Sequence, residues 1–162
     1  MTVHLHIDDR LIHGQVTVEW CSYYDIKQIY VVDDAASNDA FQKVLLPQSA
    51  RGIPTSILSE ADGVIQVPEI NQNQLNTLVV AKHVKAALAL MRAGLKPASI
   101  NVGNQAFIRG TDYVTVLPWI SITREEAQAF AEIAAMGYKI TPQRNSSDKA
   151  LDFVEQMKKK GL

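Results

Sequence analysis

The stretch that decides the fold of this 162-residue chain is Ile7-Asp8-Asp9-Arg10-Leu11-Ile12-His13-Gly14-Gln15-Val16. The alternating apolar residues Val3, Leu5 and Ile7 predict a short strand at its start, and a run compatible with a helix follows Gly14. In parallel-sheet proteins, binding and catalytic groups lie beyond the carboxyl ends of the strands. We therefore expect this stretch to be a strand-to-helix junction at such an edge.

Two side chains of the junction suit phosphoryl chemistry. A neutral imidazole such as that of His13 is a good nucleophile toward phosphorus, and Arg10 offers a planar fork of donors that fits phosphate oxygens in pairs. Backbone N–H groups can approach an oxyanion closely around Gly14, and the expected donors are those of Ile12, Gly14 and Gln15. A helix that begins near Gly14 adds a partial positive charge at its N-terminus.

The two carboxylates of the junction would repel a phosphate directly, so another role is expected for them. Asp8 and Asp9 can orient Arg10, or they can hydrogen-bond one ring nitrogen of His13 so that the other nitrogen attacks. The catalytic candidates are therefore His13, Arg10 and Asp8. From residue types alone, a salt-bridged turn with a passive histidine explains the motif equally well.

The stretch Asp8–Val16 resembles the active-site signature of the enzyme IIB component of the bacterial phosphoenolpyruvate-dependent sugar phosphotransferase system, in its mannose/fructose/sorbose family. Further matches are Val31–Asp34 followed by Ala36–Asp39, Ile100–Asn104 after Ala93–Leu95, and Ser147-Asp148. The resemblance spans nearly the whole chain, and its nine-residue signature is specific.

This resemblance implies that His13 is transiently phosphorylated. The phosphoryl group would come from a phosphohistidine on a IIA protein or domain and pass to a sugar that crosses the membrane through IIC and IID subunits. The implied activity is that of a sugar phosphotransferase with a covalent phosphoryl group on His13 and no separate cofactor or metal. The resemblance also suggests a homodimer and a cytoplasmic location, at the inner face of the membrane through IIC and IID.

Further candidates border the expected site, and they are Asp9, His6, Asp34, Asn101, Gly103 and Arg144. The family often has arginine at the position of His6, which shares one face of its strand with His4, a face expected to be polar. Asp34 follows a strand, where a carboxylate can bind a metal or a ribose, although helix capping is the expectation. Asn101 and Gly103 lie at the same sheet edge as His13 if the strands are parallel. Arg144 is a candidate for a second cation near the phosphate, although a simple surface position is the default expectation for an arginine.

Predicted strands alternate with predicted helices along the chain. Strands are expected at 3–7, 28–32, 55–58, 77–81, 99–102 and 138–141, with two β-rich pieces within 107–122. This order predicts an α/β three-layer sandwich in which helices cover both faces of a mainly parallel sheet. The length fits a single domain over residues 1–162. Trp119 lies where the chain departs from the family pattern, and we expect a packed or interface aromatic there.

Polar residues and prolines indicate where the helices begin and end. The expected N-caps are Ser37 or Asn38, Ser59, Thr123, and Ser146 or Ser147. Pro47 is expected to bend or end its helix. The polar segment 68–76 is expected to be a surface connection rather than a helix.

Composition excludes several classes of protein. A formal net charge of −1 without a basic stripe argues against nucleic-acid binding. The single cysteine, Cys21, precludes an intramolecular disulfide and suits a reducing compartment. No apolar run is long enough to span a bilayer, so a role in transport needs separate membrane subunits.

Two alternatives to a phosphocarrier stay open at this point. One is a non-catalytic α/β module that binds an anion or a nucleotide, although the chain has no Gly-x-Gly-x-x-Gly or Walker pattern. The other is a regulatory subunit whose phosphorylation state a partner senses. The sequence does not name the sugar, because selectivity belongs mainly to the membrane subunits; mannose, fructose, sorbose and N-acetylgalactosamine are all compatible.

Overall fold

The computed structural model describes residues 2–108, 110 and 112–162, except for the side chains of Gln15 and Val16. Within these residues, six strands form one parallel sheet in the order β3-β2-β4-β1-β5-β8. The strands are β1 (Val3–Ile7), β2 (Gln28–Val32), β3 (Thr55–Leu58), β4 (Thr77–Ala81), β5 (Ser99–Val102) and β8 (Ile140–Thr141). A separate antiparallel hairpin consists of β6 (Tyr113–Leu117) and β7 (Ile120–Thr123). The expected sheet is confirmed, although its last strand is shorter than predicted.

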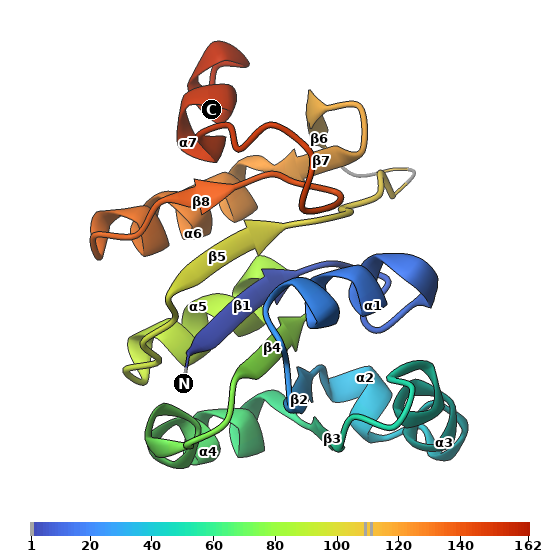
Figure 1. Cartoon of the computed structure of the whole chain (residues 1–162). Helices are drawn as coiled ribbons and strands as arrows, with labels where there is room; N and C mark the ends of the chain where they lie inside the picture. The colour runs from blue at the N-terminus through green and yellow to red at the C-terminus, as the bar shows by residue number, and fades with distance from the viewer. Residues whose placement is uncertain (1, 109, 111) are drawn as a thin grey trace.

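Helices cover both faces of the sheet, as Figure 1 shows. One face carries α1 (Gly14–Tyr23), α2 (Asp34–Ser37) and α3 (Ala40–Ser49). The opposite face carries α4 (Glu60–Gln72), α5 (Val84–Arg92) and α6 (Arg124–Ala135), and α7 (Phe153–Lys159) packs against α6. Each face has its own buried apolar cluster. The predicted three-layer α/β sandwich is therefore confirmed.

The central strand β1 positions the site through its neighbours. The register pairs Ile7 with Ala81 of β4 and with Val102 of β5, so these three strands end at the same level. The chain leaves β1 for a helix on one face, whereas β4 is followed by α5 on the other face, and β5 leads through the β6–β7 hairpin to α6 on that same face. Such a divergence opens a crevice beyond the carboxyl ends of the strands.

Alternation along β1 also corrects the expectation of a polar sheet face. Leu5 and Ile7 face the α5 layer, while His4 and His6 face α1. The ring of His4 stacks on Tyr24 at a centroid distance of 3.6 Å, and His6 meets Trp20 edge to face at 4.9 Å. Both histidines are buried because the aromatic residues at the end of α1 cover this part of the sheet.

The expected helix boundaries are correct at some positions and wrong at others. Ser59 caps α4, and Thr123 forms a capping box at α6, both as predicted. Asp39 caps α3 instead of Ser37 or Asn38, because its carboxylate accepts from two backbone N–H groups of the first turn. Asp152 caps α7 instead of Ser146 or Ser147, and the Ser147 hydroxyl is bound to Asn145.

Two prolines lie inside helices, so Pro47 does not end its helix, and the segment that starts at Pro68 begins as helix rather than as the expected surface connection. Pro47 is within the last turn of α3, and Pro68 is within α4, which continues to Gln72. A proline in a helix removes one hydrogen bond. Burial of Val67 and Ile70 on the apolar side of α4 offsets that loss, so the segment 68–72 is helical rather than a loop.

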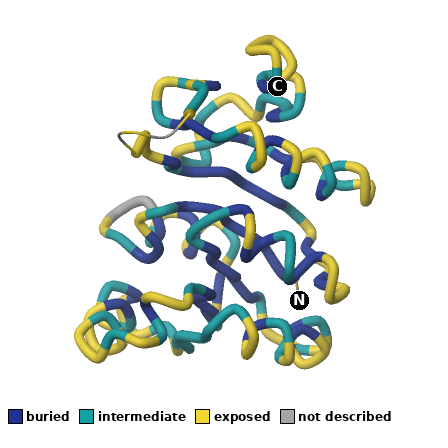
Figure 2. Tube along the Cα trace, turned by 180° about the vertical axis from the view of Figure 1, so that it is seen from behind, coloured by how far each residue is buried: buried dark blue, intermediate teal, exposed yellow. Residues whose placement is uncertain are grey.

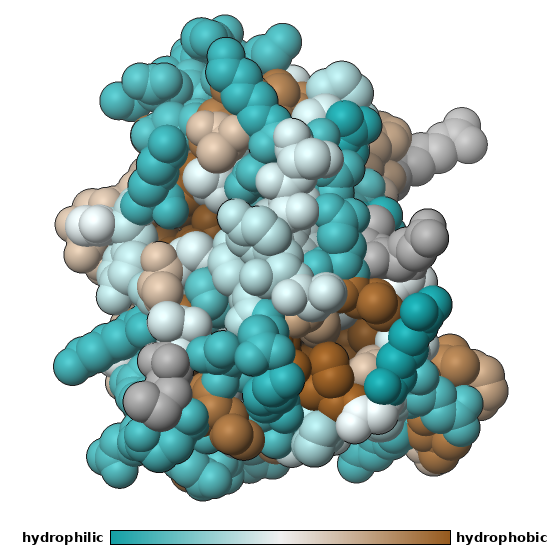
Figure 3. Space-filling view, viewed as in Figure 1, coloured by the Kyte–Doolittle hydropathy of each residue, from teal (hydrophilic) through white to brown (hydrophobic). Residues whose placement is uncertain are grey.

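Burial follows the sheet, as Figure 2 shows, and the outer turns of the helices are exposed. The outer face of α3 is apolar as well as exposed, with Phe41, Val44 and Leu45 at the surface (Figure 3). Among the helices of the described residues, none is both long enough and apolar enough to cross a membrane.

Candidate functional site at the end of β1

The loop between β1 and α1 turns back on itself and returns its side chains to Asp8. The N–H of Leu11 donates to the Asp8 carbonyl at 3.1 Å, and Leu11 adopts a left-handed conformation with φ of 58°. This conformation costs a non-glycine residue roughly 1–2 kcal/mol. Leu11 and Ile12 are only 4% and 3% exposed, so burial of their side chains against the α1 side of the sheet offsets this cost.

Asp8 has more polar contacts than any other side chain of this loop. Its Oδ1 accepts from the N–H and the Nε of Arg10, both at 3.0 Å, and its Oδ2 accepts from Nη2 at 2.9 Å. Nε2 of His13 lies 3.6 Å from Oδ2, an electrostatic contact longer than a hydrogen bond. Burial acts to raise the pKa of this carboxyl, but the contacts with His13 and Arg10 outweigh burial and lower the pKa to about 2. Asp8 is therefore ionised at neutral pH.

His13 occupies the N-cap position of α1. Its side chain makes no capping hydrogen bond in the described part of this terminus, and its Nε2 is buried with no hydrogen-bond partner among the described residues. The side chain as a whole is 25% exposed. Nε2 is the ring nitrogen that faces Asp8.

Backbone donors lie on either side of this histidine. The N–H groups of Ile12 and Gly14 donate to no other described residue, and Gly14 has a positive φ of 36° with open space around it. The N–H groups of the first turn of a helix have no intrahelical acceptor and attract anions. Gln15 lies in this first turn, and its side chain is outside the described residues.

Asp9 fastens a second loop, which follows β5, to the junction. Its Oδ1 accepts from Nδ2 of Asn104 at 2.8 Å, and its Oδ2 accepts from the N–H of Ala106 at 2.7 Å. The backbone N–H of Asp9 also donates to the Asn104 carbonyl at 2.9 Å. The hydrogen bonds of Asp9 thus hold two strand ends together, whereas those of Asp8 hold Arg10.

Gly103 gives the Asp8 carboxylate the space that it occupies. A Cβ at position 103 would collide with Oδ2 of Asp8 and would lie 3.0 Å from its Cγ. The backbone N–H of Gly103 donates to the Ile7 carbonyl at 2.9 Å, which fixes this approach. The sequence indicated Gly103 only as a residue at the sheet edge, and its contact with Asp8 supplies the steric reason for a glycine.

Asn101 and Arg144 connect a third loop, residues 142–148, to the sheet edge. Nδ2 of Asn101 donates to the Gln143 carbonyl, and its Oδ1 accepts from the Gln143 N–H, both at 2.9 Å. The guanidinium of Arg144 lies 4.2 Å from the ring centroid of Trp119, and its Nε donates to Asp148 at 3.1 Å. Arg144 also lines a small cavity beside Asp8. Asn101 therefore anchors the loop that carries Arg144 to the sheet.

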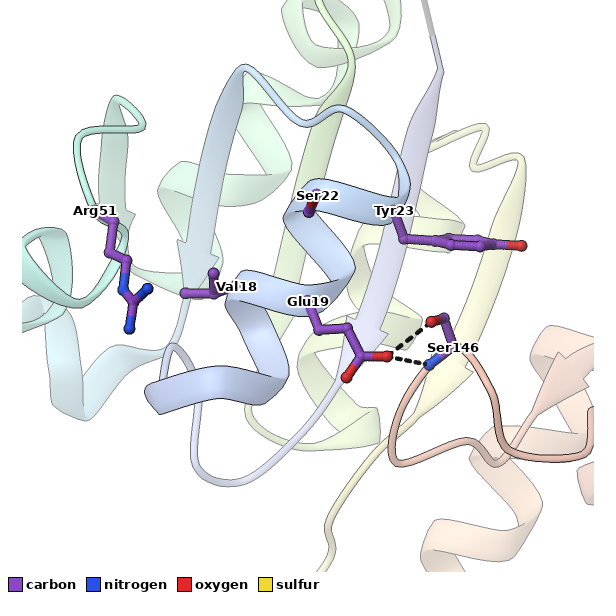
Figure 4. Close-up of a pocket in the computed structure, with 6 residues that line it drawn as sticks. All are labelled: Val18, Glu19, Ser22, Tyr23, Arg51 and Ser146. Atoms are coloured by element: carbon purple, nitrogen blue, oxygen red, sulfur yellow. Dashed lines mark hydrogen bonds between the residues drawn. The ribbon is translucent and has the colours of Figure 1, made fainter.

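The tip of the third loop is bound to α1. Oε1 of Glu19 accepts from the Ser146 N–H at 3.1 Å and from its hydroxyl at 2.7 Å (Figure 4). An open groove of about 640 Å³ lies next to this contact, lined also by Val18, Tyr23 and Arg51. The groove is lined by none of the candidate residues above, so its size does not make it the functional site.

Two other predicted residues are placed differently. His6 is buried beside Asp8, and burial, followed by repulsion from His4 and opposed by Asp8, lowers its pKa to about 3. Asp34 lies beyond the end of β2, which β4 separates from β1, and its Oδ1 accepts from the Glu60 N–H at 2.8 Å. The structure therefore brings His6 to the site and gives Asp34 a contact at the start of α4.

Two residues that hold the site together are not among the predicted site residues. Asn104 belongs only to the family pattern, and Glu19 stands in no motif. Glu19 bonds a residue 127 positions away, so no local pattern signals this contact. Among the described residues, no group of three or more His, Cys, Asp or Glu side chains lies close enough together to hold a metal ion.

A partly exposed imidazole beside a buried carboxylate, next to open backbone donors at a parallel-sheet edge, is compatible with a histidine phosphocarrier. The model of the family described as "PTS system sorbose subfamily IIB component" matches residues 2–162, and the chain belongs to this family. PTS stands for the phosphoenolpyruvate-dependent sugar phosphotransferase system.

Individual relatives agree with this assignment. The sorbose-specific EIIB component of Klebsiella pneumoniae is 29% identical over 154 residues, which cover 93% of this chain and 92% of the relative. The mannose-specific EIIAB component of Escherichia coli (strain K12) is 28% identical over 157 residues, and the match covers 94% of this chain but 47% of that longer protein. The crystal structure of the IIBSor domain of the Klebsiella sorbose permease has a TM-score of 0.89 at 25% identity, with 98% of both chains covered.

These findings confirm the predicted family, fold class and general activity. The chain is a IIB phosphocarrier, and IIB components of this family are phosphotransferases that act on sugars. The roles of individual residues are a separate question.

Proposed function

We propose that His13 is the phosphoryl acceptor and that it reacts through Nδ1. The observation that supports this most strongly is the placement of Nε2 of His13 3.6 Å from Oδ2 of Asp8. A carboxylate at that distance favours the tautomer with a proton on Nε2, which leaves the lone pair on Nδ1. It also stabilises the positive charge that the ring gains when Nδ1 forms a bond to phosphorus.

In the first transfer, the donor is a phosphohistidine of a IIA protein or domain. Nδ1 of His13 forms the new P–N bond while the P–N bond of the donor breaks, and the electron pair returns to the donor imidazole. Because the phosphoryl group passes in line between two nitrogens, catalysis consists mainly of positioning and electrostatic stabilisation.

In the second transfer, a sugar hydroxyl attacks the same phosphorus. The hydroxyl oxygen forms the P–O bond and its proton passes to water, while the P–N bond to His13 breaks and its electron pair returns to Nδ1, which restores the neutral ring. We propose that the sugar reaches this site through IIC and IID membrane subunits, and that the protein works at the cytoplasmic face of the membrane. The substrate class is that of the relatives, which are named for sorbose, mannose, fructose and N-acetylgalactosamine.

Arg10 and the backbone donors hold the phosphoryl oxygens in this proposal. Arg10 has two nitrogens on Asp8, and its side chain is 39% exposed, so the outer part of the fork remains for an anion. The N–H groups of Ile12, Gly14 and Gln15 complete the cradle at the start of α1. Arg144, which stacks on Trp119, is the second cation of the site. A carrier must release the group again, and a modest set of donors avoids over-stabilising the intermediate.

The partners follow from the same reaction. The mannose-specific relative is an EIIAB protein and is about twice the length of this chain, which supports a IIA unit as the donor. We also propose that the chain forms a homodimer, as the family resemblance suggests. A measurement of the native mass tests this.

The experiment that tests the proposal is transfer of labelled phosphate from phosphoenolpyruvate through the general phosphotransferase proteins and a IIA protein. The wild-type chain should gain phosphate that is labile to acid and stable to base, and His13→Asn should gain none. His83→Asn is the matched control. Like His13, His83 is the N-cap of a helix, here α5, and its side chain makes no capping hydrogen bond. It follows β4, the strand next to β1.

Retained acid-labile phosphate in His13→Asn, or its loss in His83→Asn alone, would contradict the assignment of His13. A wild-type chain that takes up no phosphate but binds it reversibly would instead favour a passive anion-binding module. Coexpression with IIC and IID, followed by measurement of sugar uptake, separates transport from a purely regulatory role.

A further inference from the structure

A small cavity lies beside Asp8, on the α1 side of β1. Its volume is about 10 Å³, which is room for about one water molecule. The polar side chains that line it are His6, Asp8, Thr17, Asn101 and Arg144. A cavity of this size with several polar walls meets the conditions under which buried water is held in proteins.

His6 contributes an unpaired ring nitrogen to this region. The residue is 7% exposed, and its Nε2 is buried with no hydrogen-bond partner among the described residues. A buried polar atom without a partner costs about 1–3 kcal/mol. The ring of His6 meets Trp20 edge to face at a centroid distance of 4.9 Å. His6 is neutral because burial lowers its pKa to about 3. In a neutral imidazole one ring nitrogen is a donor and the other is an acceptor.

His4 shows that an unpaired nitrogen is not a general property of this face. His4 precedes His6 by two residues and points the same way, yet its Nδ1 lies 2.7 Å from the Ser99 hydroxyl and its Nε2 2.9 Å from the Thr2 hydroxyl. His4 does not line the cavity. Of the two histidines on this face of β1, only the one that lines the cavity beside Asp8 has a buried, unpaired nitrogen among the described residues.

We propose that the cavity binds one ordered water molecule that joins the imidazole of His6 to the carboxylate of Asp8, and that His6 is thereby a positioning residue for phosphoryl transfer. The water would hydrogen-bond Nε2 of His6 and donate to the carboxylate. Oδ2 of Asp8 accepts one hydrogen bond from Arg10 and faces His13, so it has capacity for another donor. This third contact fixes the rotation of the carboxylate, and with it the orientation of His13. The inference rests on the proposed role of His13.

The first test is structural and needs no activity. In protein with isotope-labelled histidine, cross-relaxation from a long-lived water should appear at the ring protons of His6. With residue 6 labelled in each variant, His6→Phe should show no such cross-relaxation at its ring protons, His6→Gln should show it at its side-chain amide protons, and His4→Phe should leave the His6 signal unchanged. Absence of a long-lived water at His6 in the wild-type protein would overturn the proposal.

The second test is kinetic and separates positioning from binding. His6→Phe should lower the rate constant of transfer from phospho-IIA about fivefold, the equivalent of one hydrogen bond, with the KM for phospho-IIA unchanged. His6→Gln should recover most of the rate, because it can bind the same water. His4→Phe should transfer at the wild-type rate.

Each outcome decides between a positioning role and a packing role. A folded His6→Phe protein that transfers at the wild-type rate overturns the positioning role, as does an equal loss in His6→Gln and His6→Phe. If His6→Phe does not fold, the water signal in the wild-type protein and the rate of His6→Gln decide instead. Failure of the His13 proposal would appear separately, as retained phosphate in His13→Asn, and would leave the water signal unchanged.

Discussion

The same dipeptide, Asp-Asp, follows two strands of one parallel sheet, and only one of the two pairs builds a site. Asp8 after β1 is buried and pairs with Arg10 and His13, while Asp9 fastens the loop that follows β5. The second pair lies after β2. Asp33 accepts from the Ala36 N–H at 2.9 Å as the N-cap of α2, and Asp34 accepts from the start of α4.

After β2 both carboxylates accept hydrogen bonds from backbone N–H groups at helix starts, whereas after β1 the residues that follow return to Asp8. After β2 a helix begins at once, so its carboxylates satisfy backbone N–H groups. After β1 the left-handed turn at Leu11 delays the helix until Gly14, and the intervening residues carry an arginine and a histidine back to the first carboxylate. The chemistry follows from this delay rather than from the acidic pair.

The largest expected effect separates the two pairs directly. Asp8→Asn should slow phosphoryl transfer to His13 by about tenfold to a hundredfold, because hydrogen bonds to a charged group are lost. Asp34→Asn keeps an oxygen for the Glu60 N–H and should change the rate by less than about twofold. Rapid-quench measurement of transfer from phospho-IIA compares the two variants. Equal losses in both would show that Asp8 has no special role.

Acid should weaken the fold through Asp8. Its pKa is lowered to about 2 in the folded chain, below the ordinary aspartate value, so its ionised form stabilises the native state. This contribution is complete above about pH 4 and disappears as the pH falls toward about 2, with a total of about 2 kcal/mol. The measurement is the free energy of unfolding against pH for the wild-type protein and Asp8→Asn. The wild-type curve should fall more steeply in that window, and parallel curves would contradict the prediction.

Much of the fold could be predicted because buried parallel strands are compact apolar runs. The segments 28–32, 55–58, 77–81 and 99–102 are strands with the expected ends. Helix starts were less predictable where several capping residues adjoin, as at 37–39, since the choice depends on which side chain reaches two N–H groups. Pro68 misled the prediction because burial of Val67 and Ile70, a tertiary effect, holds the helix together.

One part of the site is held by contacts between residues close in sequence, and the other part is held by long-range contacts. Asp8, Arg10 and His13 lie within six positions, so a loop motif could reveal them. The contacts of Asp9 with Asn104 and Ala106 depend on β5 lying beside β1. The alternation of strands and helices predicts a parallel sheet but not the order of its strands. The roles of the loops after β5 and β8 therefore required the structure.

Arg10 binds the Asp8 carboxylate through two nitrogens, and its replacement by lysine tests whether both are needed for phosphoryl transfer. Arg10→Lys should slow transfer about tenfold, because an ammonium cannot make the two hydrogen bonds to Asp8 and also reach a phosphoryl oxygen. Arg92→Lys is the matched control: Arg92 makes a similar fork to Glu132, at 2.7 and 2.8 Å, between α5 and α6. It should transfer at the wild-type rate. An unchanged rate in Arg10→Lys would place the anion clamp elsewhere, with Arg144 as the next candidate.

The smallest expected effect tests whether Gly103 matters through Asp8. Gly103→Ala places a methyl group against the Asp8 carboxylate, so the carboxylate must shift and transfer should slow about fivefold. In an Asp8→Ala background the two nearest opposing atoms, Oδ2 and Cγ, are gone and only the Cβ at 3.3 Å remains, so the same substitution should have a much smaller effect. A double-mutant cycle of the two changes measures this coupling, and the free energy of unfolding of each variant shows whether the fold is intact. Additive losses in the cycle would mean that Gly103 acts on the backbone of its loop. A strong coupling would mean that the end of β5 shapes the site at the end of β1 by leaving room for one carboxylate.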